Sequence, residues 1–241
     1  MRITAGKQRN VPATKLAVAV ITLFVVFLLA PSATAKNSNP GILPPNSAPH
    51  GLTYGEWSAR WFKWAYEPSP TQNPVLDTTG DNCTTGQSGH VWFLAGTFST
   101  GNPPPPVTRT CSTPSGQMLF FPVGNGFCAG DGFDFAGERA CATQFAATLV
   151  NYAVEVDGVP IQGLGSNLFD SPYRALSPEW DLVLGQDNIF GAPAGTYTPG
   201  AGDGVYVMLA PLTPGEHLIH IHADFTTGGQ IDATYHLTVG K

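Results

Sequence analysis

Residues 216–239, near the end of the chain, show the clearest alternation of apolar and polar side chains. Two alternating runs flank the Gly-rich segment T-T-G-G-Q at 226–230, a pattern typical of an antiparallel hairpin with one buried face. The apolar positions are Ile219, Ile221, Ala223 and Phe225 in the first run, and Ile231, Ala233, Tyr235, Leu237 and Val239 in the second. Apolar positions must pair with apolar positions, and one register that satisfies this places Phe225 opposite Ile231 and Ile221 opposite Tyr235.

The other face of this hairpin is the only concentrated set of chemically active side chains in the chain. It carries His220, His222 and Asp224 on the first strand, facing His236, Thr234 and Asp232 on the second. Two imidazoles spaced H-x-H lie on one side of a strand, about 7 Å apart. His236 could complete a three-nitrogen site for zinc or another divalent metal, with Asp224 or Asp232 orienting a ligand or acting as general base. The alternative is an exposed polar face without a metal.

A helix is predicted close to the N-terminal end of the folded part. Thr53 and Glu56 form a capping-box pattern before the run W-S-A-R-W-F-K-W-A-Y at 57–66, which stops before Pro68. Trp57, Trp61 and Trp64 share one face of this helix. We expect that face to pack the helix onto a β core, and a sugar-stacking platform is the alternative.

Most of the remaining pattern favours short strands joined by turns. Strands are expected at 91–97, 109–112, 117–123, 150–156, 159–161, 180–184 and 204–210, with a second short helix at 138–149 and long Gly-rich loops at 124–137 and 186–203. The sequence therefore predicts a mainly β fold, an antiparallel β-sandwich of the jelly-roll or immunoglobulin-like kind. A short amphipathic N-terminal helix and a second short helix accompany it.

The first 35 residues have the features of a secretory signal. A basic start precedes an apolar run of 15 residues, Leu16–Ala30, and Ala33-Thr34-Ala35 is a cleavage site of the small-x-small type. The run is short for a membrane span, which needs about 20 residues; an uncleaved anchor is the alternative. We expect a signal peptide at 1–35, an extended leader at 36–52 and a single β domain at 53–241.

Charge and cysteine content narrow the function further. The predicted mature part, 36–241, keeps seven of the eleven basic residues and all seventeen acidic ones, a net charge of −10. This balance argues against nucleic acid or anionic lipid as a partner. All four cysteines lie in the exported part, which predicts two disulfides, Cys83–Cys111 and Cys128–Cys141. A tetrathiolate zinc site is disfavoured because no C-x-x-C spacing is present.

Two segments resemble known proteins. The run Y-G-E-W-S-A-R-W at 54–61, followed by V-W-F-L-A-G-T and L-F-F-P-V, resembles a set of secreted bacterial proteins of unassigned function. That resemblance implies export and a shared fold. The run P-G-E-H-L-I-H-I-H-A-D, with the closing Y-H-L-T-V, resembles the final hairpin of immunoglobulin-like bacterial surface domains. This second resemblance implies a β-sandwich with an adhesive or scaffolding role, although a fold alone does not define a function.

Motifs of nucleophilic catalysis are missing from the sequence, which has no G-x-S-x-G, S-x-x-K, H-E-x-x-H or P-loop. We therefore expect a secreted or cell-surface, non-catalytic module that binds carbohydrate or protein, with no membrane span beyond the signal. Aromatic loop residues such as Phe190 and Tyr197 are expected to contribute to binding. The alternative is a zinc-dependent extracellular enzyme that uses His220, His222 and His236. The sequence does not decide between them.

Overall fold

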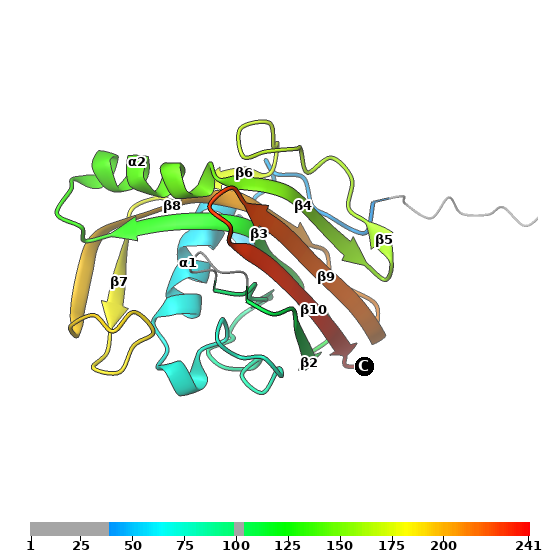
Figure 1. The fold of residues 1–241 in the computed structure, drawn as a ribbon. Helices are drawn as coiled ribbons and strands as arrows, with labels where there is room; N and C mark the ends of the chain where they lie inside the picture. Colours follow the sequence, from blue (N-terminus) through cyan, green and yellow to red (C-terminus); the bar gives the residue numbers. More distant parts are fainter. Residues whose placement is uncertain (1–38, 99–103) are drawn as a thin grey trace, which may run out of the picture. The chain divides into compact units, whose positions relative to one another are not determined.

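The strands of the protein form two five-stranded sheets (Figure 1). The computed structural model describes residues 39–98 and 104–241, so the predicted signal sequence lies outside the described residues. Sheet A contains β1 (Val91–Phe93), β3 (Met118–Ala129), β6 (Arg174–Leu176), β7 (Trp180–Leu184) and β8 (Gly195–Leu209). Its strands lie in the order β1-β3-β8-β6, and β7 also pairs with β8. Sheet B contains, in spatial order, β2 (Val107–Thr113), β10 (Gln230–Val239), β9 (Gly215–Phe225), β4 (Leu149–Val156) and β5 (Val159–Pro160).

The predicted fold class is confirmed, because the described chain is mainly β, with two sheets and two α-helices. The helices are α1 (Tyr54–Tyr66) and α2 (Phe135–Ala146), and two short 3-10 turns lie at Pro49–Gly51 and Pro70–Gln72. Most strand pairs are antiparallel, whereas the edge strands β1 and β2 pair in parallel with β3 and β10. Residues of the expected leader run beside the end of β8, where Leu43 N–H donates to Met208 and Ala210 N–H donates to Gly41.

Helix α1 begins where the capping box was predicted. The Thr53 hydroxyl accepts a hydrogen bond from Glu56 N–H, and the Glu56 carboxylate accepts one from Thr53 N–H, so two free donors of the first turn are satisfied. Trp57, Trp61 and Trp64 are all buried, and the Trp61 indole donates to the carbonyl of Leu94 just after β1. The tryptophan face therefore packs the helix against the β core, as expected.

Strands β3 and β8 extend well beyond the predicted strands, so the expected loops at 124–137 and 186–203 are wrong over much of their length. Gly124–Ala129 pairs with Gly200–Val205 to form what is called here the β3–β8 arm, and β6 and β7 pair with the other edge of β8 along it. Helices pack so closely on the two sides of this arm that a side chain larger than that of glycine would collide with them. A Cβ on Gly202 would lie 2.0 Å from the Phe62 ring of α1, and one on Gly126 would lie 2.8 Å from the Ala142 carbonyl oxygen of α2. Figure 1 shows the two helices on opposite sides of the arm.

The C-terminal hairpin keeps the predicted parity but differs in register. Ile231 pairs with Ala223, and Tyr235 pairs with Ile219, so β10 is shifted by two residues from the register expected in the sequence analysis. Phe225 N–H donates to the Gly229 carbonyl, which makes the turn tighter than the register with Phe225 opposite Ile231 would require. Because a two-residue shift preserves the alternation, the apolar side chains still face the core.

The core holds one buried cation, Arg109 on β2, which is 1% exposed. Its guanidinium donates to the carbonyls of Asp77, Ala95 and Gly96 and to the hydroxyl of Tyr235 on β10. A buried charge is costly unless hydrogen bonds replace its hydration. Arg109 therefore joins the loop before β1, the segment after β1 and the last strand at one point.

Two disulfides, Cys83–Cys111 and Cys128–Cys141, connect the cysteines in the predicted pairs. The first ties the loop after α1 to β2, and the second ties the end of β3 to α2. Within the described residues, the structure contains no helix with the length and apolar character needed to cross a membrane.

The close approach of α1 to β8 predicts that Gly202→Ala destabilises the protein. The Phe62 ring is stacked on Trp180 at 5.1 Å between ring centroids and is fully buried, so it has no room to retreat from an added methyl group. We expect a loss of about 1–3 kcal/mol of unfolding free energy, the usual cost of overpacking. Thermal or denaturant unfolding measures this loss.

Gly195→Ala on the same strand is the matched control, because a Cβ there meets no atom within 4 Å. Its melting temperature should stay close to that of the unchanged protein. Equal melting temperatures for both variants would contradict the proposed packing constraint.

Candidate functional site

The polar face of the hairpin carries the predicted histidines, now with defined neighbours. His220 Nε2 lies 3.0 Å from Asp232 Oδ1. His222 lies between two carboxylates, with Nε2 3.7 Å from Asp224 and Nδ1 3.7 Å from Asp232. The rings of His220 and His222 are 6.4 Å apart between centroids, so the H-x-H spacing does place both imidazoles on one side of β9.

The third predicted histidine occupies a different position from the one expected. His236 pairs with Leu218, whereas His220 pairs with Thr234 and His222 with Asp232. The register shift therefore moves His236 away from a position directly opposite His220. Among the described residues, no three side chains of this face bring metal-ligating atoms within 4.8 Å of one another. The face is a row of histidine–carboxylate contacts, of which His220–Asp232 is a hydrogen bond, and metal binding would require these side chains to turn.

Asp224 and Asp232 differ in what they contact. The Gln230 amide donates to Asp224 Oδ1 at 2.9 Å, and this bond, together with the nearby imidazole of His222, holds the pKa of Asp224 below its ordinary value. Asp232 instead lies between His220 and His222 and is the carboxylate that both rings approach. Of the two predicted auxiliary carboxylates, Asp232 is therefore the better placed to orient both histidines.

His217 lies at the start of β9 and closes a separate polar contact. Its Nδ1 is 2.8 Å from Asp157 Oδ2 in the turn after β4, and its Nε2 is 2.8 Å from the Thr213 carbonyl. Both ring nitrogens face acceptors, which suits the doubly protonated ring. Burial opposes protonation, but the bonds to Asp157 and Thr213 and the nearby Glu216 outweigh it, so the pKa of His217 is raised.

His50 and His90, which the sequence gives no local partners, lie together in the structure. Their rings are stacked, with centroids 5.0 Å apart and planes 19° from parallel. They stand at the rim of a groove of about 820 Å³ beside α1. Arg60, Lys63 and Trp64 of α1 line the same groove. Sequence separation hid this cluster, because a turn at 49–51 and a loop at 84–90 bring the two rings together.

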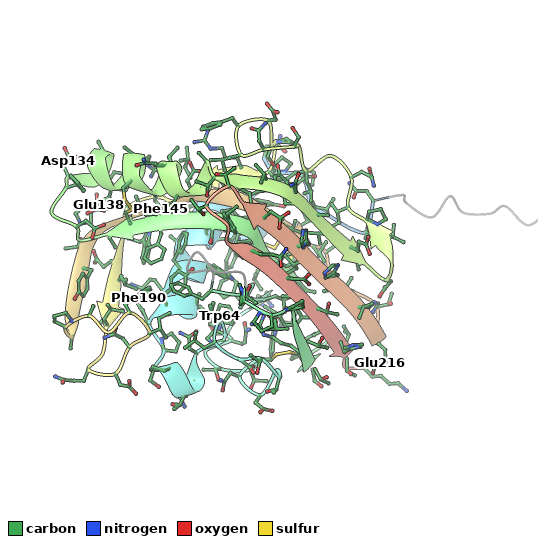
Figure 2. All side chains as sticks on the ribbon, in the orientation of Figure 1. Trp64, Asp134, Glu138, Phe145, Phe190 and Glu216 are labelled. Atoms are coloured by element: carbon green, nitrogen blue, oxygen red, sulfur yellow. A yellow bond between two sulfur atoms is a disulfide. The ribbon has the colours of Figure 1, made fainter. Side chains whose placement is uncertain are left out.

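Two smaller hollows meet around Phe145, close to the end of α2. They measure about 280 and 260 Å³, and Phe127 and Phe145 line both. The first is also lined by Tyr66, Phe98, Asn125, Gly126, Thr148, Phe225, Thr227 and Ile231. The second contains the predicted aromatic residues Phe190 and Tyr197. Figure 2 shows Phe145 on α2 and Phe190 on the loop between β7 and β8.

Phe145 is 59% exposed, although its Cβ lies close to Gly126 of the arm. Phe127, which also lines both hollows, lies on the other face of the arm and stacks on Tyr66 at 4.7 Å between centroids. Burial raises the pKa of Tyr66, so its hydroxyl is neutral at physiological pH and can both donate and accept. The hollows thus combine aromatic walls with a few polar groups, the usual composition of a small-ligand site.

Two other groups of possible metal ligands do not form a preformed metal site. Asp77, in a loop with a faint resemblance to calcium loops, accepts hydrogen bonds from the N–H groups of Thr79, Gly80 and Asn82. Its carboxylate therefore organises its own turn. Ligand atoms of Cys128, Asp131 and Cys141 lie within 4.8 Å of one another, but the two sulfurs are joined in a disulfide and offer no thiolate.

The contact of His217 with Asp157 predicts a pH-dependent contribution to stability. A raised histidine pKa stabilises the folded state at low pH, and this contribution is lost as the pH rises through the folded-state pKa. Asp157→Asn keeps an acceptor for Leu218 N–H but removes the negative charge. We expect it to lower the melting temperature by a few degrees near pH 6, with a smaller difference at pH 8.5. A difference that is constant across this range would exclude the charge contact.

The hairpin face gives a prediction for metal ions. Because its ligating atoms are paired with carboxylates and not gathered around one point, we expect zinc and EDTA to leave the melting temperature unchanged in protein purified without a His-tag. A rise with zinc that His222→Ala removes, together with bound metal in elemental analysis, would instead support the metal-enzyme hypothesis.

No family model matches this chain, and no curated protein or solved structure is significantly similar to it.

Proposed function

We propose that this protein is a secreted, non-catalytic module that binds carbohydrate in the aromatic hollows around Phe145. The observation that carries the proposal is the exposed Phe145 ring between two hollows with aromatic walls. Sugar rings have apolar C–H faces that stack on aromatic side chains, while their hydroxyl groups need hydrogen-bond partners at the edge. The hollows offer both kinds of contact.

Polar groups around the hollows suit the hydroxyls of a sugar. Asn125 and Thr148 line the first hollow, and Asp131 and Tyr197 line the second. The Tyr197 hydroxyl already donates to the Pro193 carbonyl at 2.8 Å, which fixes the ring and leaves its oxygen as an acceptor. These groups are few and come from separate elements, so they can orient a ligand without filling the hollows.

A large protein partner is less well supported by the surface. The exposed large apolar side chains of the described residues lie on separate segments: Leu76, Phe133, Phe145, Phe169, Leu176, Val183 and Leu218. Stable protein interfaces usually bury a wide surface with a contiguous apolar centre. Small hollows with aromatic walls fit a sugar unit better than such an interface.

Secretion is part of the proposal and rests on two sequence features together. The N-terminal signal pattern predicts export, and two disulfides suit an oxidising compartment. The enzymatic alternative is less well supported, because the hairpin histidines are paired with carboxylates and no three of the described ligand atoms converge there.

The proposal predicts that Phe145→Ala weakens binding of neutral oligosaccharides at least about tenfold, which corresponds to about 1.4 kcal/mol. Phe145 is the exposed one of the two residues that line both hollows, so removal of its ring opens them to solvent. A soluble glycan array, followed by calorimetric titration of each hit, provides the measurement.

Phe133→Ala is the matched control, because Phe133 is 57% exposed, precedes α2 and lines neither hollow. It should bind like the unchanged protein. A blank result across a broad array, or equal losses for both variants, would overturn the proposed site.

A further inference from the structure

The groove beside α1 is a second place where the chain can hold a ligand. It is the largest hollow described here, about 820 Å³, and shares no lining residue with the hollows around Phe145. One wall comes from α1, where exposed Arg60 and the edges of the mostly buried Trp57 and Trp64 line the groove. The opposite wall comes from the turn at His50 and the loop that ends at His90.

The groove gathers two of the cationic side chains of the described residues. The described residues include six cationic side chains: Arg60, Lys63, Arg109, Arg139, Arg174 and Lys241. Three of these are occupied by internal contacts, because Arg109 binds core carbonyls, Arg174 pairs with Asp203 and Arg139 donates to the Ser177 carbonyl. Two of the other three line the groove.

Arg60 and Lys63 differ in how many contacts they already make within the protein. Lys63 is partly engaged, since it donates to the Asp181 carbonyl at 3.0 Å and lies 3.5 Å from Glu67, the only carboxylate that lines the groove. Arg60 is exposed, and its guanidinium carbon lies 5.1 Å from the centroid of the Trp57 ring. This stacking positions the guanidinium. Its nearest acidic neighbour on α1 is Glu56, whose pKa is lowered by hydrogen bonds from Thr53 and by the Arg60 charge. The N–H donors of Arg60 make no hydrogen bond within the described residues.

The walls of the groove are fixed before any ligand binds. The Trp57 indole donates to the Pro49 carbonyl, and the Trp64 indole donates to the Thr85 carbonyl, so α1 holds both opposing segments. Both rings are mostly buried, at 6% and 8% exposed. They therefore give the groove a rigid apolar floor, and the stacked imidazoles of His50 and His90 add polar groups at the rim.

An extended peptide is a poor fit for this groove. Strand β1 is the edge of sheet A next to it, where a peptide that binds by β-augmentation would add a strand. The Gln87 side chain already occupies this edge: its amide oxygen accepts from Phe93 N–H, and its amide nitrogen donates to the Phe93 carbonyl. This mode of peptide binding is therefore blocked at Phe93.

We propose that the groove binds a sugar chain that carries carboxylate groups. Arg60 pairs with a carboxylate in the fork geometry that guanidinium groups favour, Lys63 contributes a second positive charge one helical turn away, and the histidines and Gln72 meet the hydroxyls. This site is distinct from the hollows around Phe145, and its ligand is acidic where theirs is neutral.

Calorimetric titration with trimers of galacturonate and mannuronate tests the proposal. We expect at least one trimer to bind, with affinity that falls as salt is added, and about tenfold weaker binding in Arg60→Gln. Lys241→Gln removes the same charge outside the groove and should bind like the unchanged protein. Melting curves of both variants verify that they are folded.

Further titrations separate this site from the alternatives. Phe145→Ala should leave uronate binding unchanged, and its loss in that variant would place the ligand in the hollows and overturn the groove assignment. Equal affinity of the Phe145→Ala variant for a neutral galactose trimer and for the uronates, tighter binding of a poly-glutamate peptide, no binding of either uronate or an unchanged affinity in Arg60→Gln would each overturn it as well. None of these outcomes depends on whether neutral sugars bind near Phe145.

Discussion

The approach of two helices to one glycine-rich arm is the constraint on which the rest of the structure depends. Gly202 and Gly126 lie on opposite faces of the β3–β8 arm. Because neither has a side chain, a helix can pack closely on each face. The Phe62 ring fills the space on one side, in a stack with Trp180. On the other side, Ala142 and Phe145 of α2 lie over Gly126. The candidate carbohydrate site is thus a product of backbone packing and not of one local motif.

Local patterns predicted the features that depend on near neighbours in sequence. The capping box of Thr53 and Glu56, the alternation of the hairpin and the two disulfides are all present. The register of the hairpin was wrong by two residues, because apolar alternation fixes parity but not the length of the turn. The glycines at 124–126 and 200–202 were interpreted as loops, since a glycine pattern does not distinguish a turn from a strand that another element approaches closely.

In the candidate sites too, nearby sequence predicts some residues, whereas others depend on segments far apart in the chain. The histidines of β9 could be placed on one face from their spacing, and Phe190 and Tyr197 were recognised as candidate binding residues. Phe145 gave no such signal, because nothing in its neighbourhood shows that the helix it belongs to ends beside two hollows. The stack of His50 on His90 joins residues 40 positions apart through irregular segments. The importance of Arg60 and Lys63 in the groove can be recognised only after the internal partners of the other arginines are known.

The buried guanidinium of Arg109 has a consequence for the order in which the chain folds. Its partner Tyr235 is 126 residues later in the sequence, and the parallel pairing of β2 with β10 spans the same separation. Until the last strand arrives, one side of β2 lacks its neighbour and the cation lacks its hydroxyl acceptor. Such non-local pairing is slow, because a long loop must close before any contact compensates for its entropy. We therefore expect the pairing of β2 and the hydrogen bonds of its buried cation to be completed only when the final strand is in place.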